Sequence, residues 1–89
     1  MSISMTIWKY PFAIDDEFDL SLPFGARILM VEVQGGGPCL WALVDAENAE
    51  EVRRFSIVGT GHPAPARGYI DTFQQPPFVW HLFEIAPND

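Results

Sequence analysis

Residues 27–45 contain two apolar stretches separated by three consecutive glycines. The first, RILMVEVQ (Arg27–Gln34), is apolar on both faces and contains several β-branched residues, which favours a central strand. Gly35–Gly37 supply the positive φ angles of a tight connection, and CLWALVD resumes the apolar pattern directly after Pro38. This is the clearest hairpin signal in the chain.

Further strand candidates follow from alternation between apolar and polar positions. Ile3–Tyr10 alternates in this way and is closed by Pro11. The acidic segment 15–26 carries apolar residues at period two and ends in turn residues, which predicts a short edge strand. Three more candidates are RRFSIVG, GYIDTFQ and FVWHLFEI, the last two divided by Gln75, Pro76 and Pro77.

One segment has a different composition. AENAEEVRRF (46–55) is rich in Ala and Glu, and Asp45 stands where a helix N-cap would be. Asn48 occupies the position that a capping box gives to Glu or Gln. We therefore expect either a turn or two of helix or a plain loop here.

Together these patterns predict a mainly β fold: a small antiparallel barrel or sandwich of about six strands, with at most one short helix. The length of 89 residues predicts a single β-rich domain over residues 1–89. Hydrophobic residues make up 48% of the chain, so a real core is possible.

Composition also bears on the compartment. Cys39 is the only cysteine, which excludes an intramolecular disulfide and favours a reducing compartment. The N-terminus lacks the basic start and apolar run of a secretory signal, and no stretch reaches the length of a membrane helix. We expect a cytoplasmic protein without a membrane partner.

The net charge of −7 argues against binding to nucleic acid or anionic lipid, because such binding depends on Lys and Arg contacts. The five basic residues are too few to offset the acidic ones. If Arg53, Arg54 and Arg67 did bind nucleic acid with stacked aromatic rings, binding would depend steeply on salt. The acidic residues of segment 15–19 form a solvated loop by default, or the charged rim of a partner site.

Catalytic and metal motifs are missing from the sequence. GTGHPAP has no phosphate-binding Lys, and its prolines lack N–H groups. The spacing of His62, His81 and Cys39 matches no zinc motif, and His81 in VWHLF suits a histidine hydrogen-bonded within a sheet. We predict no catalytic residue, metal ligand or cofactor. The alternative is a minimal enzyme or metal-dependent protein centred on His62, with Thr60 or an Asp nearby.

The GTGHP stretch is most simply a turn that ends a strand. Gly59 and Gly61 would permit unusual backbone angles, and the prolines that follow would stiffen the exit. His62 would then lie at a loop tip. Because loops on a rigid sheet commonly carry function, we take Thr60 and His62 as candidate binding residues.

Aromatic residues are numerous for a core of this size. A surplus at the surface of an acidic protein fits a protein interface or a homodimer, and a fully buried core is the alternative. We take Trp8, Tyr10 and Trp41 as further candidate binding residues. The function expected is a protein-interaction module that binds a protein partner or a second copy of itself.

Several motifs resemble a family of small uncharacterised proteins from bacteria and their phages. They are WKYP, PFGARIL, CLWALVD, RRFSIVGTGHP, YIDTFQ and VWHLFE, and they span nearly the whole chain. The resemblance implies a phage or prophage setting and nothing about chemistry.

Overall fold

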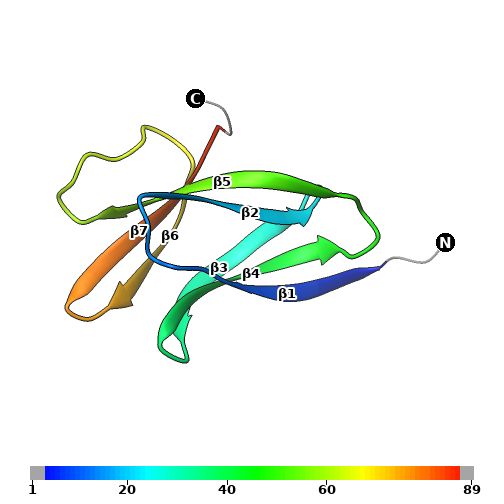
Figure 1. The fold of residues 1–89 in the computed structure, drawn as a ribbon, viewed down its shortest axis with the longest axis horizontal. Coiled ribbons are helices and arrows are strands. Elements are labelled where there is room, and N and C mark those ends of the chain that lie inside the picture. Colours follow the sequence, from blue (N-terminus) through cyan, green and yellow to red (C-terminus); the bar gives the residue numbers. More distant parts are fainter. Residues whose placement is uncertain (1–3, 87–89) are drawn as a thin grey trace.

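The computed structural model describes residues 4–86, which form seven strands (Figure 1). They are β1 (Met5–Pro11), β2 (Glu17–Pro23), β3 (Arg27–Gln34), β4 (Gly37–Asp45), β5 (Glu50–Gly59), β6 (Tyr69–Gln75) and β7 (Phe78–Ile85). The sheets are antiparallel, with orders β1-β4-β3 and β2-β5-β7-β6. No helix occurs in the described range. The predicted mainly β class is confirmed. Of the two predicted architectures, barrel and sandwich, the structure shows a sandwich, and it has seven strands.

The β3–β4 hairpin forms where the glycines predict it. Gln34 pairs with Gly37, and the loop residues Gly35 and Gly36 have φ angles of 65° and 90°. Two successive positive φ angles fit the twist of an antiparallel hairpin. Gly37 does not share them, because it is already the first extended residue of β4. The expectation of positive φ at all three glycines is wrong at this position.

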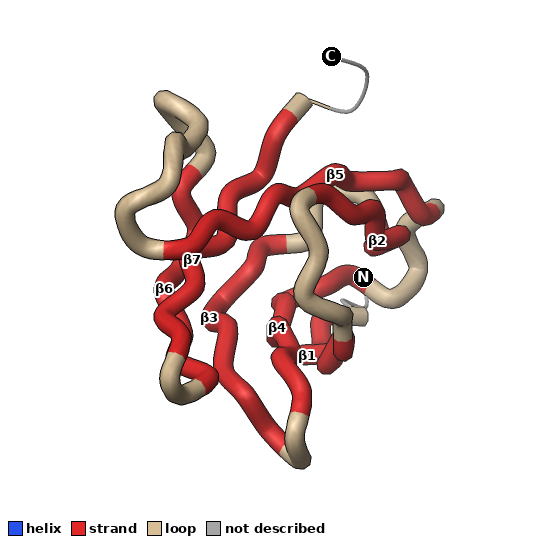
Figure 2. Tube along the Cα trace, turned by 60° about the vertical axis from the view of Figure 1, so that its left-hand side comes forward, coloured by secondary structure: helices blue, strands red, loops and turns tan. Residues whose placement is uncertain are grey.

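The expected central placement of Arg27–Gln34 is also wrong. β4 is the middle strand of the three-stranded sheet, and β3 lies at its edge. The outer edge of β3 packs against β6 of the other sheet (Figure 2). There the Val31 amide donates a hydrogen bond of 2.8 Å to the Asp71 carboxylate. β3 is apolar on both faces because it closes this side of the sandwich, not because strands flank it.

Residues 46–55 form neither a helix nor a plain loop, which corrects the sequence expectation. A turn begins at Asp45, whose carbonyl accepts from the Asn48 amide at 3.0 Å and whose side chain accepts from the Glu47 amide. The chain then runs straight into β5, which pairs with both β2 and β7. Pairing with β2 along Glu50–Phe55, joined by β7 from Arg54 onward, outweighs the helix propensity of Ala and Glu.

The core lies between the two sheets. The central strand β4 contributes Leu40, Ala42 and Val44, each 0% exposed, and β5 contributes Phe55. β2 is an edge strand, as predicted, and directs Phe18, Leu20 and Leu22 inward. Phe12 stacks on Phe18 with ring centroids 4.9 Å apart. The sandwich is therefore held by apolar burial from both sheets and the β1–β2 connection.

Residue Ile3 of the first strand candidate lies outside the described residues. Within the described range, nothing forms a helix with the length and apolar character that crossing a membrane requires.

Candidate functional site

The turn that follows β5 is built from Gly59, Thr60, Gly61 and His62. The His62 amide donates to the Gly59 carbonyl at 3.1 Å, and Gly61 has a φ of 90°. Positive φ at the third position matches a type II turn, so the predicted strand-ending turn is confirmed.

Gly59 plays a different part from the one predicted. Its φ is not positive. A Cβ atom at this position would lie 3.4 Å from His62 Cδ2 and 3.4 Å from Trp80 Cζ3. A Cβ would therefore meet these two rings at an ordinary van der Waals distance, and no unusual backbone angle requires glycine here.

Two hollows adjoin this turn. The larger, of about 810 Å³, is lined by residues that include Asp16, Gly59, His62, Phe78 and Trp80. The smaller, of about 220 Å³, is lined by residues that include Thr60, His62, Tyr69 and His81. Both hollows share Gly59, Thr60 and His62. The structure thus places the predicted binding residues Thr60 and His62 together, beside concave surface.

A chain of side-chain hydrogen bonds crosses the outer face of the four-stranded sheet. Thr60 Oγ1 lies 2.8 Å from His81 Nε2, and His81 Nδ1 lies 2.9 Å from Thr72 Oγ1. Thr72 Oγ1 lies 2.6 Å from the Tyr69 hydroxyl. The prediction that His81 is hydrogen-bonded within the sheet is confirmed. The sequence pattern groups Thr60 with His62, whereas the structure pairs Thr60 with His81 of β7.

Both ring nitrogens of a neutral His81 have a hydrogen-bond partner in either tautomer. If Nε2 carries the proton, it donates to Thr60, whose hydroxyl donates onward to the Val79 carbonyl at 3.4 Å. If Nδ1 carries the proton, it donates to Thr72, and the Thr60 hydroxyl donates to Nε2. With the proton on Nε2, these hydrogen bonds have only a structural role. The other tautomer presents the Thr60 oxygen beside a base, as in nucleophilic catalysis.

His62 takes no part in this chain and is exposed at the loop tip, as predicted. Within residues 4–86, no group of three His, Cys, Asp or Glu side chains is placed to hold a metal ion. Cys39 is buried in β4, only 4% exposed, and its sulfur lies 3.9 Å from the Gly37 carbonyl.

The three aromatic candidates do not form one surface. Trp8 and Tyr10 pair with Ala42 and Leu40, which are core residues, so their side chains extend from the inner face of β1. Trp41 pairs with Lys9 and points to the opposite face. Trp8 is nevertheless 38% exposed, because β1 lies at the edge of its sheet.

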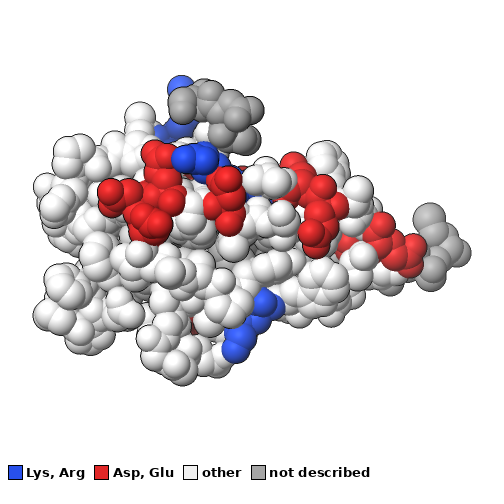
Figure 3. Space-filling view, viewed as in Figure 1, with Lys and Arg blue, Asp and Glu red and all other residues white. Residues whose placement is uncertain are grey.

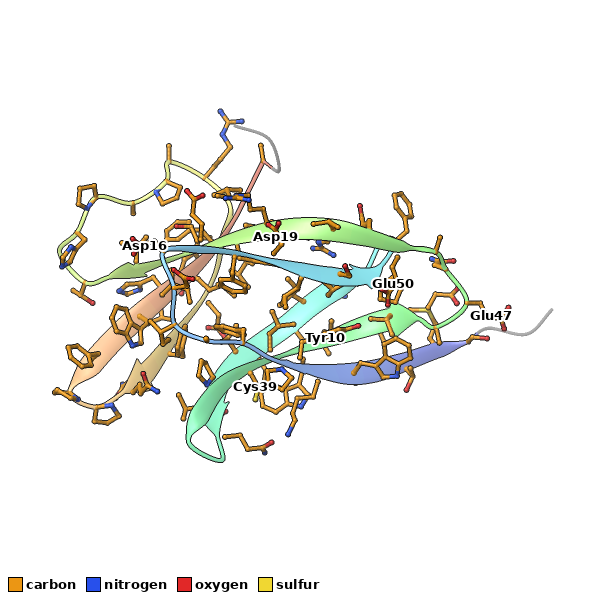
Figure 4. All side chains as sticks on the ribbon, in the orientation of Figure 1. Tyr10, Asp16, Asp19, Cys39, Glu47 and Glu50 are labelled. Atoms are coloured by element: carbon orange, nitrogen blue, oxygen red, sulfur yellow. The ribbon has the colours of Figure 1, made fainter. Side chains whose placement is uncertain are left out.

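Tyr10 carries an unusual hydroxyl. The oxygen is buried and has no hydrogen-bond partner among the described residues. Burial raises the pKa of Tyr10 above its ordinary value, and the negative charge of Glu50 raises it further. Figure 4 shows Tyr10 between β1 and β2, with Glu50 beyond it toward the β4–β5 turn.

The outward side of the three-stranded sheet is largely apolar. Ile7 pairs with Leu43, and Trp41 pairs with Met30, which places these side chains on one face. We call this set, completed by Met5, the outer apolar face. Met5, Ile7 and Met30 are 46%, 55% and 41% exposed. Such a patch on a small protein is typical of a contact surface.

Acidic residues gather elsewhere. Figure 3 shows them mainly along β2 and at the β4–β5 turn. Arg54 bonds Glu17 at 2.8 Å and Asp19 at 3.3 Å, and its hydrogen bond to Glu17 is the main cause that raises the pKa of Arg54. The surface therefore separates into an acidic edge and a nearly neutral apolar face.

Comparison with known proteins places the chain in a family. Neither the curated proteins nor the solved structures contain a match to it. A family model described as "Domain of unknown function (DUF7352)" matches residues 4–89, which include every strand of the sandwich. The chain therefore belongs to the DUF7352 family.

Proposed function

We propose that this protein is an interaction module that associates with a second copy of itself through the outer apolar face. The observation that carries the proposal is the exposure of Met5, Ile7 and Met30 around Trp41 on the outward side of the three-stranded sheet. Burying apolar area of this kind contributes about 25 cal/mol per Å². A two-fold contact would cover the same patch on both copies.

The balance of charges on the outer apolar face favours contact with a second copy of the protein. Lys9 and Arg27 extend from the same side of the sheet as Asp45 and Glu32, because they pair with or oppose outward residues of β4. Two cations and two carboxylates leave this side neutral, although the whole chain carries −7. Elsewhere the acidic edges of two copies would repel each other.

Sedimentation equilibrium over a wide concentration range tests the proposal. The wild type should form a dimer, and Ile7→Glu should shift it to the monomer because a carboxylate would be buried in the contact. Val52→Glu is the matched control, since Val52 is 56% exposed on β5 of the other sheet. A monomeric wild type at the highest concentration would refute the proposal, as would equal effects of the two variants.

The setting that we propose is the cytoplasm of a bacterium that carries a phage or prophage. The motifs quoted above support it by resemblance, and the single buried thiol of Cys39 fits a reducing compartment. Fractionation of host cells before and after prophage induction, with quantitative immunodetection, tests both parts. Constant levels on induction would count against the phage setting, and recovery outside the cytoplasmic fraction would count against the location.

A second candidate function is weak acyl transfer by Thr60. It is favoured by the 2.8 Å contact between Thr60 Oγ1 and His81 Nε2, with Nδ1 held by Thr72. Thr60 would attack an ester carbonyl, its proton would pass to His81, and the alcohol would leave before water releases the acyl group. Hydrolysis of p-nitrophenyl acetate that falls in Thr60→Val, but not in His62→Ala, would support it. A rate no higher than that of free imidazole would exclude it.

A further inference from the structure

The larger hollow beside the Gly59 turn combines an apolar lining with an acidic border. Phe78 and Trp80 stack within it, with ring centroids 5.3 Å apart at 30°, and Phe78 is 55% exposed. Asp16 and Glu17 line the same hollow. None of its lining residues is a lysine or an arginine.

The charge at this border is unbalanced. Segment 15–19 holds four carboxylates, and among residues 4–86 its ion pairs are those of Arg54 with Glu17 and Asp19. Four carboxylates less one guanidinium leave three net negative charges. Asp16 itself forms no ion pair within the described range. Figure 4 shows Asp16 at the start of β2, and Figure 3 shows no charged atoms on the neighbouring tip of the β6–β7 hairpin.

We propose that this hollow binds an arginine-bearing segment of a partner protein, with the guanidinium between Asp16 and the Phe78 ring. A guanidinium is flat and weakly hydrated, so it stacks on aromatic rings while it pairs with a carboxylate. The apolar remainder of the lining, which includes Pro63, Pro77 and Val79, accepts the side chains that flank the arginine. The negative border also speeds the approach of a basic segment.

Gly59 lies among the lining residues of this hollow and carries no side chain into it. A Cβ there would lie 3.4 Å from both the His62 and Trp80 rings, an ordinary van der Waals distance.

The first experiment probes the wild-type protein with an array of random heptapeptides and a second array in which citrulline replaces each arginine. Citrulline keeps the shape of arginine and removes its charge. We expect arginine peptides to bind at least about tenfold more tightly than their citrulline partners, which corresponds to about 1.4 kcal/mol. Binding should weaken as salt rises. Equal binding to both arrays, or to neither, would overturn the proposal.

Variants locate the site. Asp16→Asn and Phe78→Ala change side chains at the surface, and each should lower the affinity for the selected peptide about fivefold or more. Glu32→Gln on the opposite sheet is the matched control and should leave it unchanged. In heteronuclear NMR, the peptide should shift the indole signal of Trp80 and not that of Trp8. Unchanged affinity in Asp16→Asn, or a shift confined to Trp8, would contradict the assignment.

This proposal stands apart from self-association. Ile7→Glu should abolish the dimer and keep the peptide affinity, whereas Asp16→Asn should do the reverse. Loss of both properties in Ile7→Glu would place the peptide on the outer apolar face and overturn the assignment to the hollow.

Discussion

Arg53 and Glu84 join neighbouring strands β5 and β7 through a two-point ion pair. Arg53 Nε donates to one carboxylate oxygen at 2.8 Å and Nη2 donates to the other at 2.9 Å. Arg53 Nη1 also donates to the Ala26 carbonyl at 2.5 Å, directly before β3 begins. The hydrogen bond to Glu84 is the main cause that raises the pKa of Arg53. One guanidinium thus connects the four-stranded sheet to the start of the other sheet.

Glu84→Gln should lower the free energy of unfolding by about 1–2 kcal/mol, because a paired hydrogen bond between half-buried charges is lost. The side chains of Arg53 and Glu84 are 16% and 33% exposed. Urea denaturation measures the change. Glu17→Gln is the control, since solvent screens the exposed pair with Arg54 and its loss should cost less than the loss of the Arg53 pair. Equal losses in both variants would show that the Arg53–Glu84 pair stabilises the fold no more than the exposed Arg54–Glu17 pair does.

Gly68→Ala should be among the most destabilising single changes in the chain. Gly68 has a φ of 92°, and an added Cβ would lie 2.1 Å from the Glu84 carbonyl oxygen. The loop would have to leave β7, with the loss of the 2.8 Å bond from the Glu84 amide to the Gly68 carbonyl. We expect a loss of about 3 kcal/mol or more in thermal or urea unfolding.

Gly61→Ala distinguishes the cost of backbone strain from the cost of a steric clash. Gly61 has nearly the same φ, 90°, but open space around the position of a Cβ. Its cost should therefore be about 1 kcal/mol, from backbone strain alone. A Gly61→Ala loss as large as that of Gly68→Ala would contradict the close approach of the loop to Glu84.

Asp71→Ala should weaken the contact between β3 and β6, which joins the two sheets. Asp71 accepts the Val31 amide at 2.8 Å, and without it that partly buried amide would have no partner from β6. We expect a loss of about 1–3 kcal/mol and faster hydrogen exchange at Val31. Asp71→Asn retains an acceptor oxygen and should lie between Asp71→Ala and the wild type. Unchanged exchange at Val31 in Asp71→Ala would disprove the contact.

Tyr10 should make stability fall in alkali. Its pKa in the folded state is raised above 10.0, so the folded protein holds this proton more tightly than the unfolded chain does. The resulting stability is fully present below pH 10 and is lost as the pH rises through the folded-state pKa. Stability measured by urea unfolding should therefore decline above about pH 10 in the wild type.

Tyr10→Phe should weaken that alkaline decline. It should also cost little at neutral pH, or stabilise by up to about 1 kcal/mol, because it removes a buried hydroxyl that has no partner. Tyr69→Phe serves as the comparison, since its hydroxyl is exposed and hydrogen-bonded to Thr72. An alkaline decline that persists in Tyr10→Phe and disappears in Tyr69→Phe would reverse the assignment.

Local patterns predicted the strands because their cause is local. Alternation predicts β1, β2, β6 and β7, and Gly35 and Gly36 predict the β3–β4 hairpin with its two positive φ angles. The start of β5 is not predicted, because Glu50–Val52 belongs to a segment whose composition suits a helix and is extended here through its pairing with β2. β3 was misplaced since its covering comes from β6, which lies far along the chain.

The candidate site was also predicted only in part. Glycine and proline chemistry predicts the turn at Gly59–His62, and the sequence around His81 predicts that this histidine is hydrogen-bonded. The partner of Thr60 was not predicted, because strand register between β5 and β7 decides which side chains meet. The split of Trp8 and Trp41 onto opposite faces follows from register with β4 and from the parity of their positions.

The sequence by itself determined that this chain forms a small antiparallel β structure with tight glycine turns and an acidic surface, because φ preferences, alternation and charge belong to single residues and their neighbours. Only the tertiary structure decided which strands lie at the edges, which face stays apolar and that Asp16, Phe78 and Trp80 line one hollow. Those outcomes depend on how two sheets stack, and stacking energy arises between residues that are distant in the chain.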